Sequence, residues 1–439
     1  MPDHLSNQPT YTRRRFLQTG LAMISTVASV PAFLSRSAGV LAADTAMDLS
    51  SKPGVPDDRV LVVVQLSGGN DGLNTVIPYG LPTYYRQRPT LAVPDNAVLP
   101  VDTDTGIGLH PALRDVWEMA GEGIASIVQG VGYPNPNRSH FASMDVWHTG
   151  DTNPTGSNRG RGWIGRALDI AKRQQPADEN ENTEAHNLDC ITLGTEAPLA
   201  TQGRHVKPIA FQRPELLKWT GRDMDPALGE AYDALHAGDA PGDGPDDPRR
   251  FIFRTALDAQ VASERVRRAV ARDAKTRFPQ NPLANQLQMV AAMIGAELPT
   301  RVYYVGLGGF DTHANQPWQH QRLLEQFSSA MRAFYRELQA TGHDKRVVTM
   351  AFSEFGRRVA QNGSGGTDHG TAGPLFLFGD APRGGLHGMH PTLDELDNGD
   401  LIYTTDFRSI YHDLLTGWMK IDPRAALGQP YPGAGILQA

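Results

Sequence analysis

The segment between Arg59 and Leu66 constrains the fold of this chain most strongly, because it reads Arg-Val-Leu-Val-Val-Val-Gln-Leu. Nearly continuous runs of β-branched and aliphatic residues are typical of parallel strands that are covered on both faces. The run stops at residues 67–72, which read Ser-Gly-Gly-Asn-Asp-Gly and have the composition of a turn. The segment therefore predicts a buried central strand of a parallel sheet, followed by a tight turn.

Further apolar runs and helical stretches alternate along the chain. Strands are expected at 124–129, 189–193, 302–306, 347–352 and 375–378, and helices at 111–120, 162–173, 250–274, 282–296 and 319–342. This alternation favours an α/β fold with a doubly wound, mostly parallel sheet. We expect one such domain over 59–439, preceded by a polar linker at 43–58 and interrupted by a mainly helical insertion around 195–300.

The N-terminal region has the layout of a twin-arginine export signal. Residues 12–18 read Thr-Arg-Arg-Arg-Phe-Leu-Gln, a weakly apolar run extends from Leu21 to Leu34, and small residues follow around 40–42. The alternative is a basic arm that happens to precede a helix. The apolar run is shorter than the ~20 residues that span a bilayer, which argues against stable membrane insertion. Residues 1–42 are thus predicted to engage the twin-arginine export machinery, and the mature protein is expected in the periplasm or outside the cell.

Net charge and cysteine content exclude several kinds of binding partner and of thiol chemistry. The formal net charge of −7 becomes −10 when residues 1–42, with their four arginines and one aspartate, are removed. An acidic chain without a basic block is a poor candidate for binding nucleic acid or an anionic membrane surface. Cys190 is the only cysteine, so no intramolecular disulfide can form. Its apolar neighbours predict a buried thiol rather than a reactive one.

Residue types that commonly bind metals, aspartate, glutamate and histidine, follow several of the expected strands. In open α/β sheets, functional groups gather beyond the carboxyl ends of the strands. Carboxylate oxygens and neutral imidazoles are the ligands of zinc, manganese or iron at hydrolytic sites. Any single Asp-His pair can instead be a helix cap or part of a surface loop. The sets that occur here are Asp71, Asp311 with His313, Glu354 with Arg357 and Arg358, and Asp368 with His369, followed by His387 and His390.

The chain resembles the DUF1501 group of twin-arginine-exported bacterial proteins and, through it, the alkaline phosphatase-like superfamily. The resemblance covers roughly residues 59–420. The motifs that carry it are Ser-Gly-Gly-Asn-Asp-Gly at 67–72, Arg-Ser-His-Phe at 138–141, Trp-His-Thr-Gly at 147–150, Gly-Phe-Asp-Thr-His at 309–313, Ser-Glu-Phe-Gly-Arg at 353–357 and Thr-Asp-His-Gly at 367–370. It implies an alkaline phosphatase-like α/β fold and a centre that binds one or two divalent metals, zinc or manganese being the expected ions.

The resemblance also implies roles for individual residues. Asp71 corresponds to the first-strand aspartate that binds one metal, and Asp311 and His313 to ligands of the second metal, although their spacing is shorter than in phosphatases. Asp368 and His369 correspond to a pair whose members bind different metals, and His387 or His390 to a late histidine ligand. Arg357 and Asn70 are the expected substrate-binding residues, although Arg357 and Arg358 equally suit pairing with Glu354 or covering a helix face. Asp311 has the alternative of capping the helix that begins near Pro317.

The nucleophile of such enzymes opens a helix that ends near a Thr-Gly pair, which suggests Ser139. A serine there would lie in the positive potential of the helix N-terminus, where a phosphate would also bind. Its alternative role is a plain helix cap. Counting back from Trp147 and Thr149 favours His140 at this position, and Ser143 stays open as well. No serine or cysteine here is followed by the x-Pro-x-Arg pattern that formylglycine sulfatases need, which argues against an ordinary sulfatase.

These observations lead to one main hypothesis and one rival. The main hypothesis is an exported metal-dependent hydrolase whose substrate is a small anionic ester, a phosphate or a related ester such as a sulfate. The rival is a non-enzymatic periplasmic protein that keeps the fold and serves in binding or assembly. Metal content and activity on aryl phosphates distinguish the two.

Overall fold

A computed structural model describes residues 59–152, 160–174, 188–217 and 262–438 of the protein. The predicted signal peptide at 1–42 and the linker at 43–58 lie outside these residues. Residues 250–261 of the helix predicted at 250–274 also lie outside them, and the described part is helical over 262–270.

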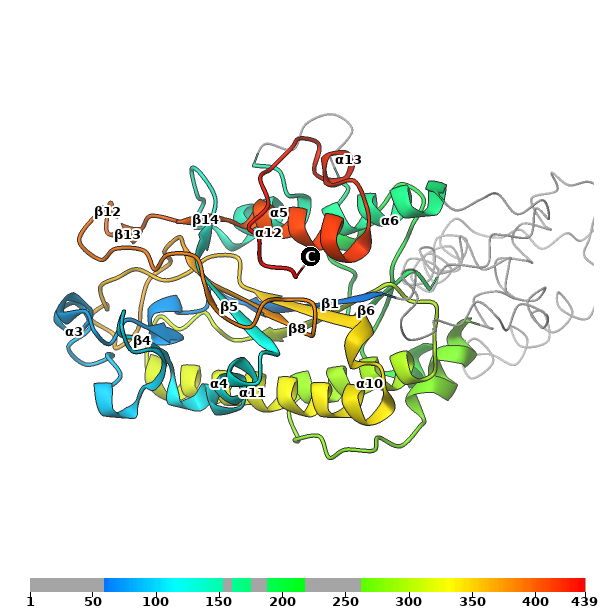
Figure 1. The fold of residues 1–439 in the computed structure, drawn as a ribbon, viewed down its shortest axis with the longest axis horizontal. Coiled ribbons are helices and arrows are strands. Elements are labelled where there is room, and N and C mark those ends of the chain that lie inside the picture. The colour runs from blue at the N-terminus through cyan, green and yellow to red at the C-terminus, as the bar shows by residue number, and fades with distance from the viewer. Residues whose placement is uncertain (1–58, 153–159, 175–187, 218–261, 439) are drawn as a thin grey trace, which may run out of the picture.

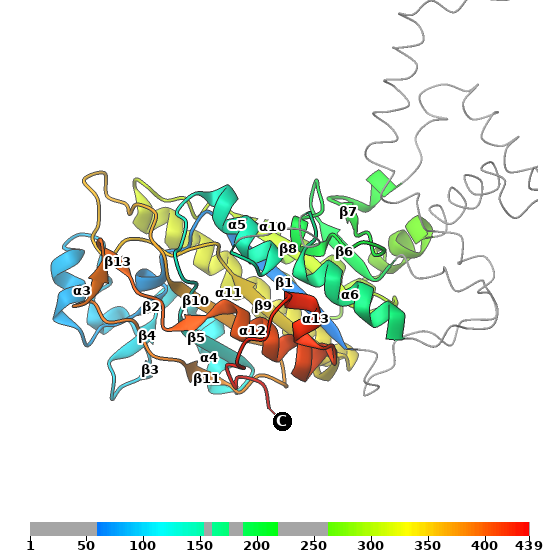
Figure 2. The ribbon, with the colours of Figure 1, turned by 90° about the horizontal axis from the view of Figure 1, so that it is seen from above.

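A mixed α/β architecture is built around one large sheet (Figures 1 and 2). Its strand order is β11-β5-β10-β9-β1-β8-β6-β7, with β14 paired to β5 beside this path. All predicted strands are present, with small differences at their ends. The strands of the sheet are β1 (Val60–Ser67), β5 (Ala125–Gly132), β6 (Cys190–Leu193), β7 (Ile209–Phe211), β8 (Val302–Gly308), β9 (Val347–Phe352), β10 (Gly373–Phe378), β11 (Gly385–His387) and β14 (Thr405–Asp406).

The sheet is parallel except at β10, which pairs antiparallel with both β5 and β9. The strands β9, β1, β8, β6 and β7 form a continuous parallel block. The prediction of a mostly parallel sheet is confirmed. Strand β7 and helix α10 (Pro282–Gly295) both fall within 195–300, the range expected to be a mainly helical insertion. This range therefore supplies an edge strand and a covering helix to the main sheet.

Helices cover both faces of the sheet (Figure 1). One layer contains α4 (Arg114–Gly121), α10 and α11 (Gln316–Thr341), and the opposite layer contains α5 (His140–Thr149), α6 (Trp163–Gln174), α12 (Phe407–Asp413) and α13 (Pro423–Leu427). The two-sided cover confirms the doubly wound class. Across the residues that the structure describes, no helix has both the length and the apolar character needed to cross a bilayer.

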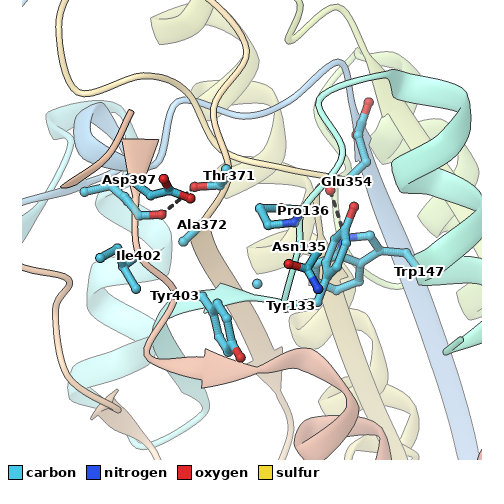
Figure 3. A pocket seen from close by; sticks show the side chains of 12 residues that line it. Tyr133, Asn135, Pro136, Trp147, Glu354, Thr371, Ala372, Asp397, Ile402 and Tyr403 are labelled. Atoms are coloured by element: carbon cyan, nitrogen blue, oxygen red, sulfur yellow. Dashed lines mark hydrogen bonds between the residues drawn. The ribbon is translucent and has the colours of Figure 1, made fainter. Parts of the chain in front are cut away.

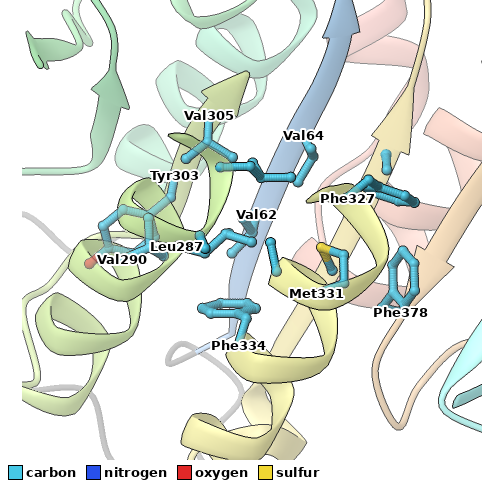
Figure 4. Packing of buried hydrophobic residues seen from close by; sticks show 14 of the residues in the cluster. Val62, Val64, Leu287, Val290, Tyr303, Val305, Phe327, Met331, Phe334 and Phe378 are labelled. Atoms are coloured by element: carbon cyan, nitrogen blue, oxygen red, sulfur yellow. The ribbon is translucent and has the colours of Figure 1, made fainter. Parts of the chain in front are cut away.

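The central strand β1 explains why its sequence lacks polar alternation. Val62 and Val64 pack in the core beneath α10 and α11, together with Phe327 (Figure 4). Leu61 and Val63 belong to the opposite core, which α5, α6 and α12 cover. Because successive side chains of a strand point to opposite faces, both faces of β1 must be apolar.

A smaller unit lies at one end of the large sheet. Its three-stranded antiparallel sheet contains β2 (Val76–Ile77), β4 (Ile107–Leu109) and β3 (Leu99–Asp102). Helix α3 (Pro82–Gln87) lies between β2 and β3 in the sequence. A two-stranded hairpin of β12 (Leu396–Asp397) and β13 (Asp400–Leu401) follows later in the chain. Leu73, Tyr84 and Leu401 share a separate apolar core here, so these segments pack together.

The cysteine prediction is confirmed. Cys190 lies on β6, is fully buried and forms no disulfide. Burial raises the pKa of its thiol. A protonated, inaccessible thiol is a poor nucleophile, so Cys190 contributes to packing rather than to chemistry.

Candidate metal centre

The neighbouring strands β8, β1 and β9 bring the predicted ligand segments together. They are parallel, and the pairs Ser67–Gly308 and Gln65–Phe352 place their carboxyl ends side by side. Asp311 and His313 therefore follow β8 at the same edge of the sheet where Glu354 follows β9. The loop that carries His369 joins this edge through a bridge to Arg357.

Three imidazoles converge on the carboxylate of Asp311. The Nε2 atoms of His313 and His369 lie 3.1 and 3.0 Å from its Oδ1, and Nε2 of His140 lies 3.6 Å from its Oδ2. The two Nε2 atoms of His313 and His369 are 3.0 Å apart. Among the described residues, His140, Asp311 and His369 form a group whose ligand atoms all lie within 4.8 Å of one another. His313 lies next to this group, with Nε2 close to Asp311 and His369, and is the fourth residue of the cluster.

The outer nitrogen of each ring has its own hydrogen-bond acceptor. Nδ1 of His140 lies 2.9 Å from Glu354 Oε1, and Nδ1 of His313 lies 3.1 Å from Asp368 Oδ1. Nδ1 of His369 lies 2.9 Å from the carbonyl oxygen of Arg138. A carbonyl or ionised carboxylate only accepts, so each Nδ1 carries a proton. In the neutral ring the lone pair is then on Nε2, which faces Asp311.

The lone pairs of the Nε2 atoms and of the Asp311 carboxylate therefore face one another at short distances. Around a zinc ion with ligands at ~2.0–2.2 Å, the edges of a tetrahedron measure roughly 3.4 Å. The separations from Asp311 Oδ1 to His369 and His313 and between these two rings are 3.0, 3.1 and 3.0 Å, and His140 lies 3.6 Å from Oδ2, so these contacts have lengths near that value. Histidine ligands of metals usually donate their outer N–H to a carboxylate or a carbonyl, as all three do here. The donor set therefore fits a divalent cation.

The cluster is accessible from solvent. Side-chain exposures are 48% for Asp311 and 45% for His313, so a small molecule can approach the ligand atoms. Burial works against ionisation of Asp311, but its contact with His369 and the hydrogen bond and charge of Arg357 lower its pKa to about 2. Hydrogen bonds from Asn362 and His313 likewise lower the pKa of Asp368. Both carboxylates are therefore charged near neutral pH, as metal ligation and its support require.

Arg357 supports the cluster rather than facing a substrate. Its buried guanidinium donates to the carbonyl oxygens of Gly69 (2.6 Å), Thr367 (2.9 Å), Phe310 (2.9 Å) and Gly68. It also donates to Asp311 Oδ1 at 2.8 Å. The prediction that Arg357 binds an anionic substrate is corrected, because these contacts use its donors within the protein and fix the position of Asp311.

Asp71 lies outside the cluster, contrary to the expectation of a metal ligand. It is completely buried, and its Oδ2 accepts from Arg88 at 2.6 Å and from Gln316. Burial alone would raise the pKa of Asp71, but the Arg88 charge and hydrogen bond hold it below the ordinary 3.8. The guanidinium of Arg88 thus supplies the positive charge that a metal was expected to supply here.

Asn70 is also placed in a structural role. Its side chain is 1% exposed, and Oδ1 interacts with Nε2 of His320 at 2.9 Å and accepts from Thr75 Oγ1 at 3.0 Å. The prediction that Asn70 binds substrate is corrected, because this amide is closed off in the protein interior.

Neither late histidine belongs to the cluster. Nε2 of His387 contacts the carbonyl oxygen of Arg383, and Nδ1 of His390 lies 2.8 Å from the carbonyl oxygen of Pro391. Burial lowers the pKa of His390. The expected ligand role of His387, and the alternative of His390, are corrected, because both rings are held by neighbouring main-chain oxygens.

Ser139 is the N-cap residue of α5, directly before His140. Its side chain is exposed and makes no capping hydrogen bond. Its main-chain N–H donates to Asn137 Oδ1 at 2.8 Å. The alternative candidate Ser143 is buried, donates to the carbonyl oxygen of Glu354 and contacts the Tyr133 hydroxyl. Of the two serines, Ser139 therefore has the hydroxyl that can reach a substrate.

A cavity of about 120 Å³ adjoins the cluster through Glu354 (Figure 3). Tyr133 and Trp147 line one side, and Ile402 and Tyr403 line the other. The main chain of Glu354 borders the cavity, while its carboxylate points away from it toward His140. The cavity and the ligand cluster thus lie on different sides of the same residue.

Sequence reasoning considered His140 only as a possible nucleophile and did not identify Glu354 as a support. The sequence did mark both residues, because His140 lies in the motif at 138–141 and Glu354 in the motif at 353–357. Their contact joins residues 214 positions apart, which no local pattern indicates.

The sequence matches the family described as "Protein of unknown function (DUF1501)" over residues 123–418. The matched range contains all four residues of the cluster. No curated protein matches the sequence significantly.

Two similar solved structures are a sulfatase and a synthase. The PsFucS1 sulfatase from Pseudoalteromonas sp. superposes with a TM-score of 0.37 and 8% identity, covering 91% of this chain and 75% of that one. The lipoteichoic acid synthase LtaP from Listeria monocytogenes superposes with a TM-score of 0.31 and 12% identity, covering 83% and 81%. Both superpositions are loose, and the α/β class rests on the sheet and helical layers described above.

Proposed function

The chain belongs to the DUF1501 family, and we propose that it is an exported, metal-dependent hydrolase of a phosphate or related ester. The observation that carries the proposal is the convergence of three Nε2 atoms on the carboxylate of Asp311, each ring held from behind by its Nδ1. The resemblance to the alkaline phosphatase-like superfamily supplies the reaction class.

Each residue of the cluster has a defined task in this proposal. His140, Asp311, His313 and His369 would hold one cation, and Arg357 keeps Asp311 in place. Once bound, such a cation would polarise an ester oxygen and lower the pKa of a water molecule. The first N–H groups of α5, a ten-residue helix, favour a negatively charged group beside the cluster.

Direct measurement of metal and activity tests the proposal. Protein purified from its native compartment should contain close to one zinc or manganese per chain by elemental analysis, and it should hydrolyse aryl phosphate or aryl sulfate esters. Bound metal without any hydrolysis would favour the rival function, a periplasmic binding or assembly protein. Protein that neither contains nor takes up a divalent metal would overturn the proposal.

Ser139→Ala is the test of the attacking group. If the serine hydroxyl attacks the ester, the variant should lose several orders of magnitude in kcat, because the attacking atom itself is removed. Its metal content and thermal unfolding midpoint should match those of the parent, because the hydroxyl makes no hydrogen bond in the described structure. Ser143→Ala is the matched control. An unchanged kcat in Ser139→Ala would assign the attack to water.

Replacing Arg13 and Arg14 together by lysine tests the export. The precursor should then stay in the cytoplasm, because the arginine pair is the recognised feature of the signal. Cell fractionation and immunoblotting measure the distribution, with Arg36→Lys as a control outside the motif. Periplasmic accumulation of the double variant at the parent level would contradict export by this route.

A further inference from the structure

Glu354 receives three hydrogen bonds from a single face of helix α5. Its carbonyl oxygen accepts from Ser143 Oγ at 2.6 Å and from Trp147 Nε1 at 2.8 Å. Its carboxylate pairs with His140 Nδ1 at 2.9 Å. Positions 140, 143 and 147 lie on the same side of a helix. One residue at the end of β9 therefore holds both the helix and the metal ligand that the helix carries.

The Glu354 carboxylate is itself firmly held. Its side chain is 2% exposed, and Oε1 also accepts from the main-chain N–H of Gly68 at 2.8 Å. Oε2 lies 3.2 Å from Ser353 Oγ. Gly68 follows β1 and Glu354 follows β9, so the carboxylate ties the two strand ends together behind His140.

We propose that Glu354 is a positioning residue that orients His140 for metal binding. Its carboxylate keeps the proton of the ring on Nδ1, so that the Nε2 lone pair faces Asp311. It also makes the imidazole a stronger electron donor, as carboxylate partners of metal-ligating histidines do. The inference rests on the proposed metal centre and adds a residue that does not touch the cation.

The three outer partners of the cluster are not equivalent. Asp368, the partner of His313, is 57% exposed, so water screens its charge. Arg138 offers only a neutral carbonyl oxygen to His369. Glu354 is the buried, charged partner, and charge-assisted hydrogen bonds in such surroundings are the stronger ones. Its charge should therefore matter most for metal affinity.

Glu354→Gln isolates that charge. The glutamine oxygen can still accept from His140 and Gly68, so the folded structure should persist. We expect the affinity for zinc to fall about 10–100-fold, measured by competition with a chromophoric chelator. The visible absorption bands of the cobalt-substituted protein should also change, because they report the geometry around the ion.

Two matched variants separate positioning from stability. Asp368→Asn makes the same chemical change at the exposed partner and should lower zinc affinity less than Glu354→Gln does. Ser143→Ala removes a bond between α5 and Glu354 without touching His140, and should keep the parent's zinc affinity and cobalt spectrum. The metal-free forms of Glu354→Gln and the parent should unfold at similar temperatures.

The possible failures are distinguishable. If Glu354→Gln binds zinc as tightly as the parent, or if Ser143→Ala loses as much affinity, the positioning role is overturned while the metal centre stands. If the parent protein binds no divalent metal, the proposed function fails first, and this inference fails with it.

Discussion

His369→Ala is expected to lower the affinity of the protein for zinc by more than about 100-fold, beyond the loss caused by removing an outer partner. Nε2 of His369 lies 3.0 Å from both Asp311 Oδ1 and His313 Nε2. Its loss would remove a direct ligand from the centre of the cluster. Under the proposed function, ester hydrolysis should fall with metal content, because the bound ion would polarise the ester.

Chelator competition and thermal unfolding measure this effect independently of activity. A ligand at 100 times its Kd stabilises the folded state by about 2.7 kcal/mol, so zinc should raise the unfolding midpoint of the parent but not that of His369→Ala. His387→Ala is the control, because His387 contacts the carbonyl oxygen of Arg383 instead of the cluster. Equal zinc affinity in the parent and His369→Ala would remove the centre described here.

Much of the fold was predictable from the sequence, for a physical reason visible at β1. A strand buried on both faces needs apolar side chains at every position, and Val60 to Val64 supply them. The same reasoning predicted that Asp311 and His313 would lie beside the end of β9, since the carboxyl ends of adjacent parallel strands are neighbours. Asp368 and His369 reach this edge because β10, which they precede, runs antiparallel to β9. The antiparallel direction of β10 and the short edge strand β7 left no comparable signal.

The site was less predictable, because its chemistry depends on pairs distant in sequence. A carboxylate that binds a metal and one that binds an arginine look alike in a motif, and Arg88 decides between them for Asp71. Likewise, a guanidinium closed in by carbonyl oxygens, as in Arg357, cannot be distinguished by sequence from one that awaits a substrate. His140 lies far from Asp311 and Glu354 in the sequence, so only the folded structure brings these three side chains together.

The buried pair of Asp71 and Arg88 leads to a second large effect. Arg88→Met should lower the free energy of unfolding by about 3–5 kcal/mol, because removal of one partner leaves a buried charge uncompensated. Both side chains are 0% exposed, so water cannot replace the lost guanidinium. Urea unfolding of parent and variant measures the difference. Adding Asp71→Asn to Arg88→Met should recover part of the loss, since the remaining side chain is then neutral.

The pH dependence of this difference follows from the direction of the Asp71 shift. In the folded parent the pKa of Asp71 lies below 3.8, so its contribution to stability is fully present above that value. The contribution is lost as the pH falls through the folded pKa. The gap between parent and Arg88→Met should therefore be widest near neutral pH and should narrow in acid.

The variant Arg88→Met also tests how many cations the protein binds. With Arg88 in place, a cation beside Asp71 would meet a guanidinium 2.6 Å from the carboxylate oxygen, and the repulsion between like charges disfavours it. We therefore expect one zinc per chain in the parent, bound around Asp311. If Arg88→Met stayed within about 1 kcal/mol of the parent, a typical single-mutation effect, and bound a second zinc, Asp71 would regain the ligand role that its sequence position suggested.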